Sequence, residues 1–114
     1  MFWEYYRKVE KGLSVPIEDF KYNIIIKEEV KEGIRGLMKI LEEKIKKITN
    51  KNNIEEGLVE LLSNSRISPA LYQEMVDILR LYKKLDVVED EILYSMLVRI
   101  LEDIEELYTI IGSH

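Results

Sequence analysis

Arg80 is the residue with the clearest capacity for chemistry, and Tyr82, Lys83 and Lys84 follow it closely. A guanidinium can hold a phosphate group through paired hydrogen bonds. Tyrosine and lysine, in contrast, are mostly protonated near neutral pH and are poor bases. Asp77 lies three residues before Arg80, so an ordinary exposed ion pair between the two is the simpler interpretation. Only phosphate binding makes Arg80 the centre of a candidate site.

Two groups of carboxylates suggest a different, metal-dependent chemistry. Acidic residues three or four positions apart lie on one face of a helix, and such groups can hold Mg²⁺ against phosphates. In this respect the chain resembles the all-helical MazG-like nucleoside triphosphate pyrophosphatases, although the two groups are farther apart than is usual in that family. Because glutamate is abundant here, acidic pairs also arise by chance, and we predict no metal site and no cofactor. The residues concerned are Glu28, Glu29, Glu32, Glu74 and Asp77.

Composition excludes several further kinds of site. The chain of 114 residues has no cysteine and one histidine, His114, which excludes disulfides and sulfur-ligated zinc. The formal net charge of −5 argues against nucleic-acid binding by general phosphate neutralisation. No apolar run approaches the roughly 20 residues needed to span a bilayer, and no signal peptide is evident, so we expect a cytosolic protein. Its many Ile, Lys and Glu residues resemble thermophilic compositions.

Hydrophobic periodicity predicts helices throughout the chain and no strand. We predict one all-α domain over residues 1–111, an antiparallel bundle of four to five helices. The last three residues, 112–114, are typical of a cloning remnant. The expected helices cover about 2–11, 24–48, 54–62 and 69–84, then the residues after a break near 85–86, with room for one helical turn at 17–20.

Local signals fix several of these helices. Ser68, with Pro69 at the first helical position, is the strongest helix start in the chain, and Asn53 can cap another helix. Gly33 and Gly36 could permit a close crossing by a neighbouring helix. The aromatic residues near the N-terminus recur at helical spacing and favour a clamp over the core rather than a surface that stacks nucleobases. They are Phe2, Trp3, Tyr5 and Tyr6.

The last helix has a wider apolar stripe than a helix needs to cover one side of a core. Only Tyr94, Ser95 and Arg99 interrupt it between residues 92 and 101. We therefore expect this helix to contact several neighbours and to form a homodimer interface. The residues predicted for that interface are Ile92, Met96, Leu97 and Ile100.

Three stretches, IIIKEEVKEGIRGLMKILEEKI, EEGLVELLSNSRISPALYQEMVDILRLYKKL and VEDEILYSMLVRILEDIEELYTII, resemble the HEPN superfamily of helical bundles. They are similar in particular to the HepT-like ribonuclease toxins that accompany minimal nucleotidyltransferase antitoxins. The resemblance covers about residues 20–111. It rests on the order of the helices, the Ser-x-x-Leu helix start and the position of Arg80.

In that family the Arg is usually followed by Asn, then by His five positions after the Arg and by Tyr two positions beyond. The resemblance implies that the Arg binds the scissile phosphate and the His takes part in metal-free RNA cleavage. Here Arg80 matches, whereas Leu81, Leu85 and Val87 stand at the other three positions. Leucine cannot transfer a proton, and general acid–base catalysis typically contributes about 100- to 10,000-fold in rate.

We therefore predict a degenerate, non-catalytic member of this type that acts through dimerisation and protein association. The resemblance implies a nucleotidyltransferase-type partner in a toxin–antitoxin module. The alternative is a residual metal-independent ribonuclease that uses Arg80 with Tyr82 or a lysine.

Overall fold

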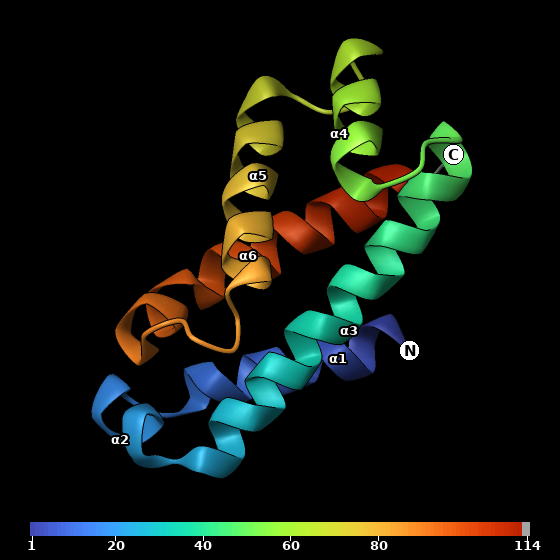
Figure 1. The fold of residues 1–114 in the computed structure, drawn as a ribbon. Helices are drawn as coiled ribbons and strands as arrows, with labels where there is room; N and C mark the ends of the chain where they lie inside the picture. The colour runs from blue at the N-terminus through green and yellow to red at the C-terminus, as the bar shows by residue number, and fades with distance from the viewer. Residues whose placement is uncertain (113–114) are drawn as a thin grey trace.

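The computed structural model describes residues 1–112, and every regular element within them is helical (Figure 1). This confirms the all-α prediction. The described chain has six α-helices rather than four or five, because the turn expected at 17–20 is a complete helix. The elements are α1 (Phe2–Glu10), a short 3₁₀ helix η1 (Lys11–Ser14), α2 (Ile17–Tyr22), α3 (Ile24–Thr49), α4 (Ile54–Ser63), α5 (Pro69–Lys83) and α6 (Asp90–Gly112).

The helices form an elongated body with principal extents of 43 × 24 × 21 Å. Figure 1 shows α4 and α5 as an antiparallel pair that stands across α6. In the same view α3 and α6 run in the same general direction, and α1 runs against them. The bundle is therefore antiparallel for some helix pairs only. Of the proposed cloning remnant, Gly112 ends α6, and Ser113 and His114 lie outside the described residues.

Side-chain caps begin the helices where the sequence predicts them. The Ser68 hydroxyl accepts a hydrogen bond from the Leu71 backbone N–H at 3.0 Å, and the Asn53 side chain accepts one from the Glu56 N–H at 2.8 Å. Asn23 caps α3 in the same way. Such caps satisfy backbone donors that have no partner within the first helical turn. These short-range bonds place the starts of three helices.

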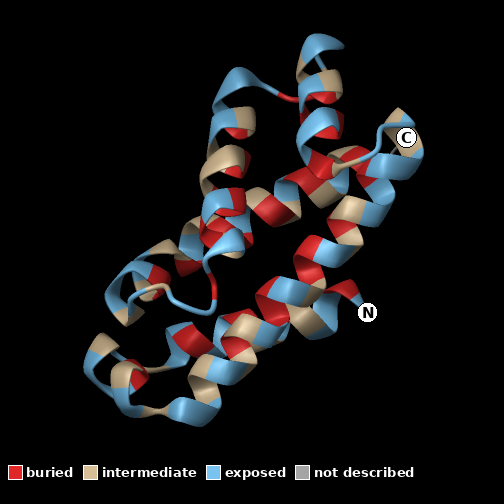
Figure 2. Cartoon of the chain, in the orientation of Figure 1, coloured by how far each residue is buried: buried red, intermediate tan, exposed pale blue. Residues whose placement is uncertain are grey.

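One hydrophobic core runs through the described chain, and α6 lies in its middle (Figure 2). This helix contacts α1, α2, α3 and α5, as its broad apolar stripe predicts. Leu97 and Ile100 are fully buried inside the chain itself. Their assignment to a dimer interface was therefore wrong, because neighbouring helices of the same chain already cover them. Ile92 is 49% exposed and Met96 is half-buried, so these two remain near the surface.

The N-terminal aromatic residues close over the last helix, which confirms the predicted clamp. The Phe2 ring stacks on the Tyr108 ring with centroids 3.8 Å apart. The Tyr6 hydroxyl donates a hydrogen bond to Glu105 at 2.9 Å. Burial and this bond to a carboxylate raise the pKa of Tyr6 to about 12. The first and last helices are therefore joined by both apolar and polar contacts.

The predicted close crossing occurs where α1 passes over α3. A Cβ atom at Gly33 would lie 2.6 Å from the Tyr5 backbone oxygen, and one at Gly36 would meet the Tyr5 ring. Glycine at these two positions lets the helix backbones approach to a distance that a larger residue would prevent.

In residues 1–112, no helix combines the length and apolar character needed to cross a lipid bilayer. The cytosolic location stays a prediction.

Candidate functional site

A groove of about 470 Å³ opens between the C-terminal half of α5, the turn after it and the N-terminal half of α6. We call it the α5–α6 groove. Five apolar residues and five charged residues line it. The apolar ones are Leu81, Val87, Val88, Ile92 and Met96, and the charged ones are Asp77, Arg80, Lys84, Glu89 and Arg99.

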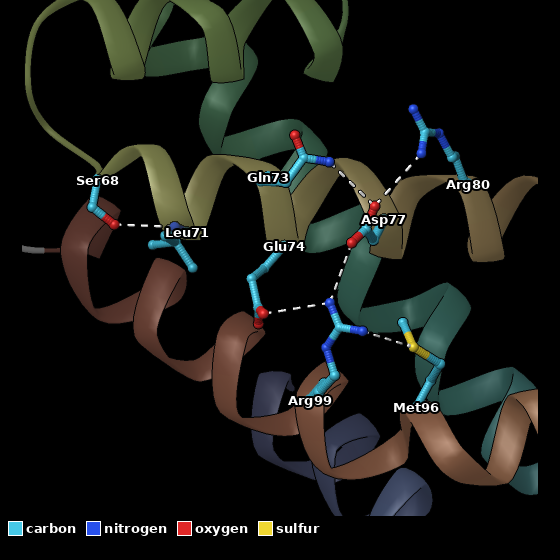
Figure 3. Close-up of polar contacts among 8 residues, drawn as sticks. All are labelled: Ser68, Leu71, Gln73, Glu74, Asp77, Arg80, Met96 and Arg99. Carbon is cyan, nitrogen blue, oxygen red and sulfur yellow. Dashed lines mark hydrogen bonds and ion pairs between the residues drawn. The ribbon is translucent and has the colours of Figure 1, made fainter.

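The structure brings two of the four predicted catalytic candidates to this groove. The Arg80 side chain is 73% exposed and points away from the helix pair, with the Asp77 carboxylate 3.6 Å from its nearest nitrogen (Figure 3). Lys84 also lines the groove. Tyr82 instead packs against the core, and Lys83 pairs with Glu55 of α4 at 3.8 Å, outside the groove. The candidates therefore do not form one constellation.

The residue at the His position of the resemblance is buried and does not line the groove that holds Arg80. Leu85 is 2% exposed and belongs to the core, and it does not line the groove. Val87, at the Tyr position, is 79% exposed and does line it. A histidine at position 85 with the same orientation would be buried among apolar side chains. Position 85 thus offers neither a proton-transferring residue nor an exposed place for one.

Arg99 of α6 joins the candidate site to the acidic residues of α5. Its guanidinium lies 3.4 Å from the Glu74 carboxylate and 3.3 Å from that of Asp77 (Figure 3). The side-chain amide of Gln73 also donates to Asp77 at 3.3 Å. The bond to Asp77 raises the pKa of Arg99. Asp77 is therefore shared among three partners, and Arg80 is more exposed than Arg99.

Asp103 lies one helical turn beyond Arg99 and forms a carboxyl pair with Glu74. Burial, together with the hydrogen bond and the charge of Glu74, raises the pKa of Asp103 to about 7, against the opposing effect of Arg99. In the described chain the Asp103 Oδ2 atom is buried without a hydrogen-bond partner. A proton shared with Glu74 would satisfy it. This pair can therefore change its charge near neutral pH.

The acidic groups considered for Mg²⁺ do not form a metal site. Across residues 1–112, no three His, Cys, Asp or Glu side chains come close enough together to hold a metal ion. Glu29 pairs with Lys11 at 2.5 Å, and Glu32 pairs with Lys8 at 3.0 Å. Glu28 is exposed. Glu74 and Asp77 are occupied by the same arginine, as described above, so a cation fits neither acidic group.

Sequence reasoning selected Arg80, Glu74 and Asp77 but missed Arg99 and Asp103. The two missed residues are four positions apart and therefore share a face of α6, which was the available signal. That this face meets α5 depends on how the two helices cross.

Comparison of the chain with models of known protein families, with curated proteins and with solved structures finds no match. The resemblance to HEPN proteins therefore rests on the quoted stretches alone.

Proposed function

We propose that this chain is a degenerate HEPN-like protein that acts by association and not by catalysis, and that its first partner is a second copy of itself. The observation that supports this most directly is an exposed stripe on the N-terminal half of α6. Ile92 and Val98 are each 49% exposed, and the small residue Ser95 lies exposed between them. We call these residues, with Glu91 and Arg99, the α6 stripe.

The α6 stripe is self-complementary. Suppose that two copies pack antiparallel with Ser95 at the crossing point. Ile92 and Val98 of both copies are then removed from solvent, and the small serine lets the helix axes approach. The same packing brings Glu91 within reach of Arg99 of the partner subunit. These side chains have opposite charge and are 59% and 42% exposed, respectively. A twofold dimer requires one surface to match itself in this way.

The non-catalytic part of the proposal is supported by the position of Leu85. A hydrocarbon side chain in the core can neither accept nor donate a proton, and the exposed Arg80 alone supplies only anion binding. The resemblance further suggests a nucleotidyltransferase-type protein as a second partner in a toxin–antitoxin module. The isoelectric point of about 5.0 makes the chain negatively charged at neutral pH, which agrees with a partner that offers basic residues.

Light scattering after size exclusion tests the dimer. We expect the wild-type chain to have twice the monomer mass and Val98→Glu to reduce it to a monomer, because the glutamate places two like charges in the interface. Val59→Glu is the matched control: Val59 is 48% exposed but lies on α4, and its variant should remain dimeric. A wild-type chain that stays monomeric at high concentration refutes the dimer.

A second candidate function is metal-independent RNA cleavage, which the gathering of Arg80, Lys84 and Arg99 at one groove favours. Incubation of the purified chain with structured RNA in EDTA tests it. Cleavage that disappears in Arg80→Ala but persists in Arg7→Ala, on the exposed side of α1, would replace the non-catalytic proposal.

A further inference from the structure

We propose that the α5–α6 groove binds a small amphipathic anion, namely an unbranched aliphatic chain that carries one carboxylate or phosphate head group. The groove's volume of about 470 Å³ lies in the range typical of small-molecule sites, roughly 300 to 1,000 Å³. Apolar side chains line it together with Arg80 and Lys84 from the end of α5 and Arg99 from α6. This combination matches a ligand with one apolar part and one negatively charged part.

The apolar floor is poorly covered by the chain itself. Val87 is 79% exposed, and Val88 and Met96 line the same groove; Ile92, which also lines it, is not counted here because the proposed dimer covers it. An aliphatic tail laid along these side chains removes apolar surface from water on both sides of the contact, which favours binding. A free inorganic anion gains nothing from this floor.

The cations at the α5 end are available to a head group. Arg80 has its carboxylate neighbour at 3.6 Å, too far for a strong hydrogen bond, and that carboxylate, Asp77, is also held by Arg99. The Lys84 ammonium forms no ion pair within residues 1–112 and is exposed. Arg80 lies in the last turn of α5, Lys84 is the residue that caps the end of this helix, and both line the groove. Together they can hold one anionic group between them.

Glu89 fixes the orientation of the ligand. It lies in the turn just before α6, lines the groove and is exposed, so it repels a head group placed beside it. The anion is therefore held at the α5 end and the tail extends towards α6. Removal of the Glu89 charge should strengthen binding, a result that a purely apolar groove would not produce.

Titration calorimetry on the full chain tests the site with octanoate, octyl phosphate and the neutral 1-octanol. We expect both anions to bind and the alcohol to bind at least about tenfold more weakly, as the loss of contacts to two exposed cations implies. The double variant Arg80→Gln/Lys84→Gln should weaken octanoate binding by about the same factor. Glu89→Gln should strengthen it about twofold. Comparison of the two anions distinguishes a carboxylate from a phosphate head group.

Lys83→Gln is the matched control, because Lys83 lies next to Lys84 but outside the groove; its octanoate binding should equal that of the wild type. Circular dichroism melting of each variant separates lost binding from lost folding. The titration is repeated in Val98→Glu, so that failure of the dimer and failure of this site give different results. Equal binding of octanol and octanoate overturns the proposal, as does octanoate binding that the double variant does not change. Displacement of bound octanoate by inorganic phosphate or short RNA at equal concentration also overturns it, since neither has a tail.

Discussion

Replacement of Asp103 by asparagine tests the carboxyl pair. Asparagine keeps the shape of the side chain but cannot ionise, so it removes the charge that the folded chain accommodates poorly. In the folded chain the Asp103 carboxyl holds its proton up to a pH of about 7, against an ordinary pKa of 3.8. The groups that face it are Glu74 from α5 and Arg99 and Glu106 from α6 itself. Asp103→Asn should therefore stabilise the fold at high pH.

The sign follows from proton binding. Between pH 3.8 and about 7 the folded state keeps a proton that the unfolded state has released, so this group's contribution to stability falls as the pH rises and is constant above about 7. A pKa difference of this size corresponds to roughly 4 kcal/mol at about 1.4 kcal/mol per pH unit. Because Asp103 is only half-buried, solvent screening reduces this to about 1 to 2 kcal/mol.

Urea denaturation followed by circular dichroism at several pH values between 4 and 8 measures the effect. The advantage of Asp103→Asn over the wild type should rise from near zero at pH 4 to about 1 to 2 kcal/mol at pH 8. Glu102→Gln is the control, because Glu102 is an exposed residue beside Asp103 on α6, and its effect should be small throughout. If the variant is destabilised at pH 8, or if its effect does not depend on pH, then the Asp103 charge does not destabilise the folded chain and the reasoning is wrong.

Three further substitutions probe the packing, with urea denaturation as the measurement. Gly33→Ala should lower the free energy of unfolding by about 1 kcal/mol, because overpacking against backbone costs about 2 kcal/mol and the helix preference of alanine offsets about 1 kcal/mol of this. Gly112→Ala is the control and should not lower it, because Gly112 has open space around it. Equal effects of the two substitutions would contradict the close crossing. Ser68→Ala should cost about 1 kcal/mol through the lost bond to Leu71, and Ser68→Thr should recover most of it. Leu85→His should cost about 2 to 4 kcal/mol without producing RNA cleavage in EDTA, and a stable variant that cleaves RNA would support an enzymatic ancestry for the groove.

Features set by neighbouring residues could be predicted from the sequence. The caps at Ser68 and Asn53 reach backbone groups only three residues away, so their residue types identify them directly. The sequence predicted only one helical turn where α2 forms, because six residues make a marginal helix on their own. Its completion depends on Phe20, which is fully buried against distant parts of the chain, and a local pattern does not contain that information.

Features set by helix crossings could not be predicted. The periodicity of α6 identified apolar faces but not which neighbours cover them, and so Leu97 and Ile100 were placed at an interface although they are fully buried. The same reason applies to Arg99. Its bonds to Glu74 and Asp77 span 25 and 22 residues, and only the crossing of α5 over α6 brings these charges together.

The joining of the first and last helices has a consequence for synthesis of the chain. The Phe2 ring stacks on the Tyr108 ring, and the Tyr6 hydroxyl donates a hydrogen bond to Glu105, which lies 99 residues later in the chain. While the ribosome is still making α6, the aromatic residues of α1 have no cover on that side. We therefore expect the nascent chain to present them to chaperones, and folding to be completed only after α6 has left the exit tunnel.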